Sequence, residues 1–323
     1  MGKADFTFRY KVRNWSEYNR ALVRRGQLIL WFDEGTIAAW RDTTRSNEPG
    51  RTRSNEPGRP KVYADAAIEC ALILKSVFHL SLRATQGFLG SVVTLMRLEL
   101  PVPDYSTMSR RQAGLAVSLP PASCSGARHV VVDSTGLKVY GAGEWHAGKY
   151  RRAGRRVWRK LHLGVDETTR EILAADVTQS RVHDSRRMPA LLSQIPGTIA
   201  QISGDRGYDT RAAYDAVLAR GAVATIVPRR NARMSWGIDP PTWRRARDAT
   251  LRAIEAQGRY CWRTSSGCTR QSLAENAMFR FKAVFGGKLW ARTFDNQRVE
   301  AVIKCAVLNQ MTKLGMPHPI RVR

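Results

Sequence analysis

The stretch His129-Val-Val-Val-Asp-Ser-Thr-Gly136 decides the fold class of this chain. Three consecutive β-branched apolar residues are typical of a strand buried in a sheet, and the run ends at the carboxylate of Asp133. A second acid has the same setting, because the apolar run Ile199-Ala-Gln-Ile202 is followed closely by Asp205. Two acids that follow buried strands predict a site at one edge of a sheet.

The pattern around these runs predicts an α/β domain over residues 128–316. Strands are expected at 129–132, 157–165, 171–177, 199–203 and 222–227. Helices are expected at 184–194, 210–220, 272–285 and 295–314. Three strands in succession, followed by alternating helices and strands, predict a mixed five-stranded sheet.

Residues 1–120 have a helical pattern instead. Two helical stretches, 61–80 and 82–96, precede Pro101-Val-Pro103, and a short helix capped by Asp104 or Ser106 follows. This arrangement resembles a helix-turn-helix. We therefore expect residues 1–120 to form a helical DNA-binding region with Arg110 and Arg111 at the DNA, an ordinary helical pair being the alternative.

A perfect tandem repeat interrupts this region, since the eight residues 44–51 recur as 52–59. Each copy is polar and contains Pro and Gly, which predicts a flexible solvated loop. A duplication tolerated in a loop explains it better than an arm that touches phosphate.

The charge balance indicates a polyanionic partner. Lysine and arginine number 53 against 27 acids, a net charge of +26, and a surplus of this size favours double-stranded DNA. A membrane surface is disfavoured, because the chain has neither a separate basic amphipathic stretch nor ~20 unbroken apolar residues. With five scattered cysteines and no signal-peptide pattern, we expect a cytoplasmic protein with no membrane partner and no small-molecule substrate.

A third acid lies on a predicted helix. Glu275 belongs to Ser272-Leu-Ala-Glu-Asn-Ala-Met-Phe-Arg-Phe-Lys282. If the strands that precede Asp133 and Asp205 are neighbours, this helix can bring Glu275 to the same edge. Hard oxygen ligands suit Mg²⁺ or Mn²⁺, and two such ions about 4 Å apart can support phosphodiester cleavage. The alternative is that these acids are ordinary turn and surface residues.

A basic segment follows Asp133 in the chain. Residues 149–160 contain seven basic side chains in twelve: Lys149, Arg151, Arg152, Arg155, Arg156, Arg159 and Lys160. So many like charges favour a grip on the DNA backbone over a solvated loop. Two tryptophans, Trp236 and Trp243, lie among arginines between Asp205 and Glu275. They are candidates for stacking on a flipped base, with ordinary packing equally expected.

Residues 128–316 closely resemble the DDE transposases of bacterial insertion sequences, in the insertion sequence five family. The matching blocks are 131–141, 158–166, 204–210, 272–282, 289–298 and 305–311, and residues 82–115 are similar too. The resemblance implies a ribonuclease-H-like catalytic fold, with Asp133, Asp205 and Glu275 as catalytic metal ligands for two Mg²⁺ or Mn²⁺ ions. It implies that Lys282 holds a phosphate. It further implies a homo-oligomer on DNA in the bacterial cytoplasm, associated with the nucleoid.

Two positions before the glutamate depart from the family pattern. Cys268 stands where the family has tyrosine, and Gln271 stands where it has arginine. The adjacent Arg270 is the candidate replacement for DNA contact, although a shift of one residue turns a helical side chain by about 100°. These departures leave two alternatives to a transposase: a catalytically decayed DNA-end-binding protein, or a metal-dependent nuclease that cuts without joining.

Overall fold

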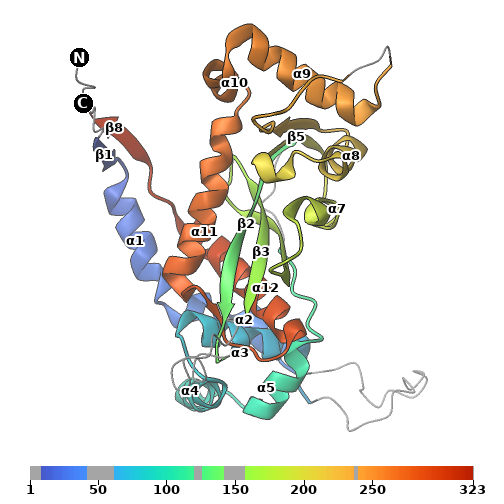
Figure 1. Cartoon of the computed structure of the whole chain (residues 1–323). Coiled ribbons are helices and arrows are strands. Elements are labelled where there is room, and N and C mark those ends of the chain that lie inside the picture. Colours follow the sequence, from blue (N-terminus) through green and yellow to red (C-terminus); the bar gives the residue numbers. More distant parts are fainter. Residues whose placement is uncertain (1–8, 42–61, 120–125, 142–156, 236–238, 323) are drawn as a thin grey trace, which may run out of the picture.

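The computed structural model describes residues 9–41, 62–119, 126–141, 157–235 and 239–322. Its centre is a six-stranded mixed sheet with the order β4-β3-β2-β5-β6 and a short β7 paired with β2 (Figure 1). The strands are β2 (Arg128–Val139), β3 (Trp158–Asp166), β4 (Ile172–Gln179), β5 (Ile199–Gly204), β6 (Val223–Ile226) and β7 (Lys288–Leu289). The tandem repeat at 44–59 lies outside the described residues.

The pairing directions confirm the expected mixed sheet. Strands β2, β3 and β4 form an antiparallel meander, whereas β5 pairs parallel with both β2 and β6. The expected number of five strands is wrong by one, because β7 has only two residues and shows no alternation that a sequence pattern can reveal. Its pairing to Lys138 and Val139 extends the sheet at the far end of β2.

Strand β2 is longer than expected, and Asp133 lies within it rather than at its end. The antiparallel register with β3 continues past Asp133, which pairs with Leu163, to Lys138, which pairs with Trp158. The physical reason is the alternation beyond the acid, where Leu137 and Val139 are buried and Gly136 is exposed. That alternation is typical of a half-buried strand.

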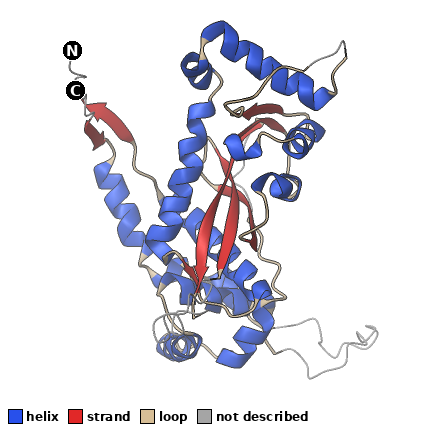
Figure 2. Cartoon of the chain, viewed as in Figure 1, coloured by secondary structure: helices blue, strands red, loops and turns tan. Residues whose placement is uncertain are grey.

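Helices cover both faces of the sheet (Figure 2). Odd-numbered residues of β2, including Val131 and Leu137, pack in one core cluster with α11 (Ser272–Phe285) and α12 (Phe294–Leu314). Even-numbered Val130 and Val132 pack in a second cluster with α7 (Met188–Leu192) and α8 (Arg211–Ala219). The predicted helix at 184–194 is a 3-10 turn, η2 (Asp184–Arg187), followed by α7.

The N-terminal helices after the first share the first core cluster with α11 and α12, whereas the first helix contacts α12 outside that cluster. The N-terminal helices are α1 (Trp15–Arg25), η1 (Leu28–Leu30), α2 (Glu34–Ala38), α3 (Asp65–Val77), α4 (Leu82–Leu95) and α5 (Tyr105–Gln112). Asp104 caps α5 by accepting hydrogen bonds from the N–H groups of Ser106 and Thr107. Near the two ends of the chain, β1 (Arg9–Val12) pairs with β8 (Pro319–Val322) beside α1 (Figure 1).

Two further helices, α9 (Thr242–Gln257) and α10 (Arg259–Ser265), lie between β6 and α11. They are absent from the elements expected from the sequence, because polar and charged residues dominate both helices. A 3-10 turn, η4 (Cys268–Gln271), then leads directly into α11. None of the helices in the described segments has the length and apolar character needed to cross a bilayer.

Candidate active site

The parallel pairing of β2 with β5 brings the first two acids together. Val132 pairs with Gly204, so Asp133 and Asp205 follow at adjacent positions on neighbouring strands, which lie about 4.8 Å apart. A shared site is expected from the sequence only if these two strands are neighbours in the sheet, and they are. Asp205 is exposed and begins the turn η3 (Arg206–Tyr208), where its side chain accepts a hydrogen bond of 2.8 Å from the N–H of Gly207.

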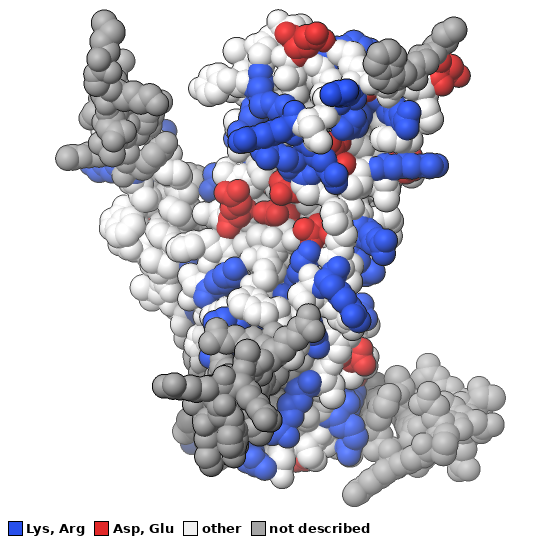
Figure 3. All heavy atoms as spheres, in the orientation of Figure 1, with Lys and Arg blue, Asp and Glu red and all other residues white. Residues whose placement is uncertain are grey.

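Glu275 reaches this region from the first turn of α11. The amide of Gln271, which immediately precedes the helix, donates a 3.0 Å hydrogen bond to the carbonyl of Val132. This contact ties the start of α11 to the residue before Asp133. Because side chains alternate along a strand, Asp133 shares the face of Val131, on which α11 packs. Figure 3 shows a patch of acidic atoms on this side of the molecule, with lysine and arginine atoms above and below it.

The electrostatics of Asp133 indicate that these acids act on one another. Burial raises the pKa of Asp133 to about 6, the N–H of Ser134 opposes this rise, and the charges of Asp205, Glu275 and Asp184 add to it. Carboxylates that raise the pKa of a neighbour favour the binding of a cation, which removes the repulsion.

Asp184, in η2, is a fourth acid that the sequence analysis did not identify. It accepts a 2.9 Å hydrogen bond from Lys160 and lies 3.9 Å from Nδ1 of His162. The signal available in the sequence was a further acid soon after a strand, in Val182-His-Asp-Ser185. Burial lowers the pKa of His162 to about 4, so that ring is neutral at pH 7.

Tyr208 lies beneath the same region. Its hydroxyl is buried and makes no hydrogen bond to any described residue. Burial raises its pKa well above 10, and the charges of Asp184, Asp133 and Asp205 raise it further, so the hydroxyl stays protonated. Its ring packs under Gly204, where an added Cβ would lie 3.1 Å from the ring. The close approach of this ring explains why glycine precedes Asp205.

Lys282 lies on the same side of the sheet as the acids. Its ammonium donates a 2.7 Å hydrogen bond to the hydroxyl of Thr135. Thr135 is two residues beyond Asp133, so both point to the same face of β2. Both Glu275 and Lys282 are exposed on α11, which leaves them accessible to a ligand at this face.

The donor set fits a hard divalent cation. The side chains offer carboxylate oxygens, the ligands that Mg²⁺ and Mn²⁺ prefer, and the charges of Asp205 and Glu275 add to the rise that burial causes in the pKa of Asp133. No three His, Cys, Asp or Glu side chains of the described residues are already close enough to coordinate one ion.

The two departures from the family pattern have structural roles. Cys268 is buried in η4, with 2% of its surface exposed, and Gln271 anchors α11 to β2 as described above. Arg270 instead forms a 2.8 Å ion pair with Glu167, which also contacts His129 at the start of β2. Contact between Arg270 and DNA stays a prediction, because the ion pair with Glu167 does not test it.

The other predicted DNA-binding residues differ in accessibility. On α5, Arg110 is exposed, whereas Arg111 is held by Asp65 and the carbonyl of Tyr63. Of the basic segment, Lys149, Arg151, Arg152, Arg155 and Arg156 lie outside the described residues.

The last two residues of the basic segment, Arg159 and Lys160, belong to β3 and make internal contacts. Arg159 donates to Gln297, and Lys160 donates to Asp184 and to the carbonyl of Val182. Farther along the chain, Trp243 packs against the second core cluster and Trp236 is outside the described part of the chain.

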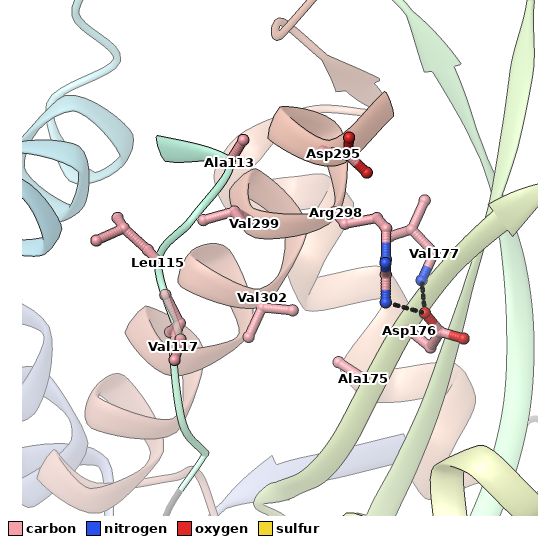
Figure 4. Close-up of a pocket in the computed structure, with 11 residues that line it drawn as sticks. Ala113, Leu115, Val117, Ala175, Asp176, Val177, Asp295, Arg298, Val299 and Val302 are labelled. Atoms are coloured by element: carbon pink, nitrogen blue, oxygen red, sulfur yellow. Dashed lines mark hydrogen bonds and ion pairs between the residues drawn. The ribbon is translucent and has the colours of Figure 1, made fainter. Parts of the chain in front are cut away.

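A cavity of about 240 Å³ lies away from the acids, between α12, β4 and the segment after α5 (Figure 4). Its walls are mostly apolar. Asp176, its buried acid, accepts a hydrogen bond from the N–H of Val177 and lies 3.7 Å from Arg298. Arg187 also pairs with Asp176. Asp176, the buried acid of this cavity, is therefore already paired with arginines, and we assign the cavity no chemistry.

The contact between Gln271 and β2 leads to a first prediction. We expect Gln271→Ala to lower the rate of DNA cleavage several-fold while DNA binding is retained, because α11 loses a hydrogen bond worth about 1 kcal/mol that holds Glu275 near Asp133. Cleavage and binding measured on the same labelled duplex test this. Ser272→Ala, at the next position, is the control and should leave both unchanged. An unchanged cleavage rate in Gln271→Ala would show that the anchor is dispensable.

Carboxylates on two neighbouring central strands of a mixed sheet, in a chain of net charge +26, are features expected of an enzyme that acts on the phosphodiesters of nucleic acid. Comparison with known families identifies the group. Residues 125–310, more than half of the chain, match a family described as "Transposase DDE domain", and residues 23–142 match a second family with the same description. The chain belongs to the DDE transposases, enzymes that cleave DNA and transfer its strands with divalent metal ions.

A solved structure is similar over much of the chain. It is described as "piggyBac transposase synaptic complex with hairpin DNA" and shares 11% sequence identity. The match covers 91% of this chain and 80% of that one, with a TM-score of 0.27.

Proposed function

We propose that this protein is the transposase of a bacterial insertion sequence, of the insertion sequence five family. It binds the terminal inverted repeats of its element, cleaves a DNA strand at each end with water as nucleophile, and joins the freed 3′-hydroxyl to target DNA. The observation that carries this proposal is the register that pairs Val132 with Gly204 and so places Asp133 beside Asp205, with Glu275 tied to the same strand through Gln271.

Each site residue has a role in this proposal. Asp133, Asp205 and Glu275 would hold two Mg²⁺ or Mn²⁺ ions, which when bound supply activation of the attacking oxygen and stabilisation of the leaving one. Asp133 must be ionised to bind a cation, and because its pKa is raised to about 6, binding releases a proton from it only at about pH 6 and below. Lys282 exchanges Thr135 for a phosphate oxygen and orients the strand that is cut.

The sheet order supports a ribonuclease-H-like catalytic domain over residues 128–316. Three antiparallel strands are followed by two parallel strands on the other side of β2, which is the arrangement that the family resemblance implies. Residues 1–120 are proposed to recognise the element ends, with the exposed Arg110 on α5 at the DNA.

Cutting two ends in one reaction requires at least two copies of the chain on DNA, so we propose a homo-oligomer. Its location would be the nucleoid of the bacterial cytoplasm.

Two alternative functions differ from a transposase in whether DNA is cut or joined. A decayed DNA-end-binding protein is favoured by Cys268 and Gln271, where the family pattern has tyrosine and arginine. A nuclease that cuts without joining would use the same acids.

One assay separates the three functions, and it is our second prediction. Purified protein is incubated with labelled element ends, a target plasmid and Mg²⁺, and we expect labelled DNA joined to the plasmid. Chelation of the metal should abolish joining but leave end binding. Nicked ends without joined product would identify a nuclease, and a bound but uncut end would identify a decayed protein.

A further inference from the structure

A cationic and aromatic surface lies at the end of β2 that is distant from the acids. Lys138 pairs with Trp158 of β3 on one side and with Lys288 of β7 on the other, so these three residues form a row across the sheet. Tyr140 and Trp290 form the next row, with ring centroids 4.3 Å apart and 31° between the ring planes. We name these five residues the aromatic platform.

The platform faces away from the core. Val139 and Leu289, which pair with each other between the two rows, are buried with α11 and α12 behind the sheet. Side chains alternate along a strand, so the platform residues point to the opposite face. Tyr140 is 50% exposed, Trp290 51% and Trp158 39%. On that face, α7 and α8 pack around Val130 and Val132, toward the other end of β2.

The rings are held in place before any ligand binds. The backbone N–H of Trp290 donates to both carboxylate oxygens of Glu300, at 3.0 and 2.9 Å. The ring of Trp158 lies over Gly136, where an added Cβ would be 3.3 Å from it. Fixed rings lose little conformational entropy when a flat partner stacks on them.

Positive charge accompanies the rings. The ammonium of Lys138 lies 5.6 Å from the ring centroid of Trp158, and that of Lys288 lies 5.8 Å from the centroid of Tyr140. Exposed aromatic faces interleaved with lysines are the features of surfaces that stack bases and hold phosphates.

We infer that the aromatic platform binds unpaired nucleotides of DNA, whose bases stack on Trp290, Tyr140 and Trp158 while Lys138 faces the phosphates. Intact duplex does not fit, because both faces of each base are already stacked on neighbouring bases. Tyr140 lies seven residues beyond Asp133, roughly 24 Å along the strand direction, and on the opposite face of the sheet, so the platform is a surface separate from the acids. This inference rests on the proposed function and adds the form of DNA that the enzyme holds.

The test measures the affinity of the full-length protein for a fluorescein-labelled oligothymidylate and for a labelled duplex of equal length. Stacking of one base contributes about 1–3 kcal/mol, so Trp290→Ala should weaken single-strand binding by at least about 5-fold and leave duplex binding unchanged. Trp290→Phe should retain most of the affinity. Tyr260→Ala, which removes an aromatic ring that is 84% exposed on α10, is the matched control and should change neither.

Several outcomes would overturn the inference. Equal losses of affinity for single-stranded DNA and for duplex would mean that the platform does not stack unpaired bases and contributes to binding only through its charge. Unchanged single-strand binding, with Trp290→Ala altering the sedimentation of the free protein, would make the platform a contact between copies of the chain. Joining of element ends is scored separately with wild-type protein. Failure of the proposed function therefore appears as the absence of joined product with wild-type protein. Failure of this inference appears as a Trp290→Ala variant whose affinity for single-stranded DNA does not fall relative to its affinity for duplex.

Discussion

Replacing Asp133 with asparagine is expected to abolish DNA cleavage and, at the same time, to stabilise the fold at neutral pH. The first effect follows from the loss of a carboxylate that the proposed metal site requires, and we expect a fall in rate of at least about 10³-fold. The second follows from the raised pKa of Asp133, which shows that its charge is unfavourable in the folded chain without a cation. DNA-end binding should survive, because the phosphate contacts are elsewhere.

The sign and the pH range of the stability effect follow from that pKa. The carboxyl has an ordinary pKa of 3.8 when unfolded and about 6 when folded, so between these values the folded state binds more protons. The free energy of unfolding therefore falls as the pH rises from about 4 to about 6 and is then constant. Asparagine does not titrate, so the free energy of unfolding of the variant lacks this contribution to its pH dependence. Above pH 6 the variant should be more stable than wild type by on the order of 3 kcal/mol.

Thermal unfolding between pH 4 and 8, without divalent metal, measures this difference. Asp209→Asn, in the turn that follows Asp205, is the control, because the side chain of Asp209 is fully buried against Arg247 at 2.8 Å and its loss should destabilise the fold. Mg²⁺ should raise the melting temperature of wild type and not that of Asp133→Asn. Retained cleavage in Asp133→Asn, or lower stability at pH 7.5, would contradict the assignment of this acid.

Much of the candidate site was predictable because its residues follow elements with strong local patterns. The valine run before Asp133 and the apolar run before Asp205 both specify buried strands, and parallel neighbours place the residues that follow them side by side. The helix of Glu275 and Lys282 was also predictable, and α11 has the expected bounds.

Contacts between distant parts of the chain were not predictable in this way. Gln271 and Val132 are 139 residues apart in sequence, and Asp184 is near Asp133 only because η2 folds back over β3. Ser134-Thr-Gly136 resembles a turn by composition, yet pairing with β3 keeps it extended. Composition also cannot tell an exposed arginine from a paired one, as Arg110 and Arg111 show.

Lys282→Ala is expected to slow DNA cleavage by about 10- to 100-fold. In the structure the ammonium rests on Thr135, a neutral hydroxyl, at 2.7 Å. A phosphate oxygen is a stronger acceptor, and a hydrogen bond between charged groups contributes about 1.5–3 kcal/mol. We therefore expect Lys282 to leave Thr135 for DNA, and its removal to weaken the hold on the strand that is cut.

The control for this substitution is Thr135→Val, which removes the resting contact of Lys282 without removing its charge. If Lys282 acts on DNA, Thr135→Val should cleave at nearly the wild-type rate and Lys282→Arg should recover part of it. The logarithm of the binding constant should also fall less steeply with salt in Lys282→Ala, by about one phosphate contact. Equal damage from Thr135→Val and Lys282→Ala would mean instead that the pair only fastens α11 to β2, and that the phosphate near Glu275 is held by another residue.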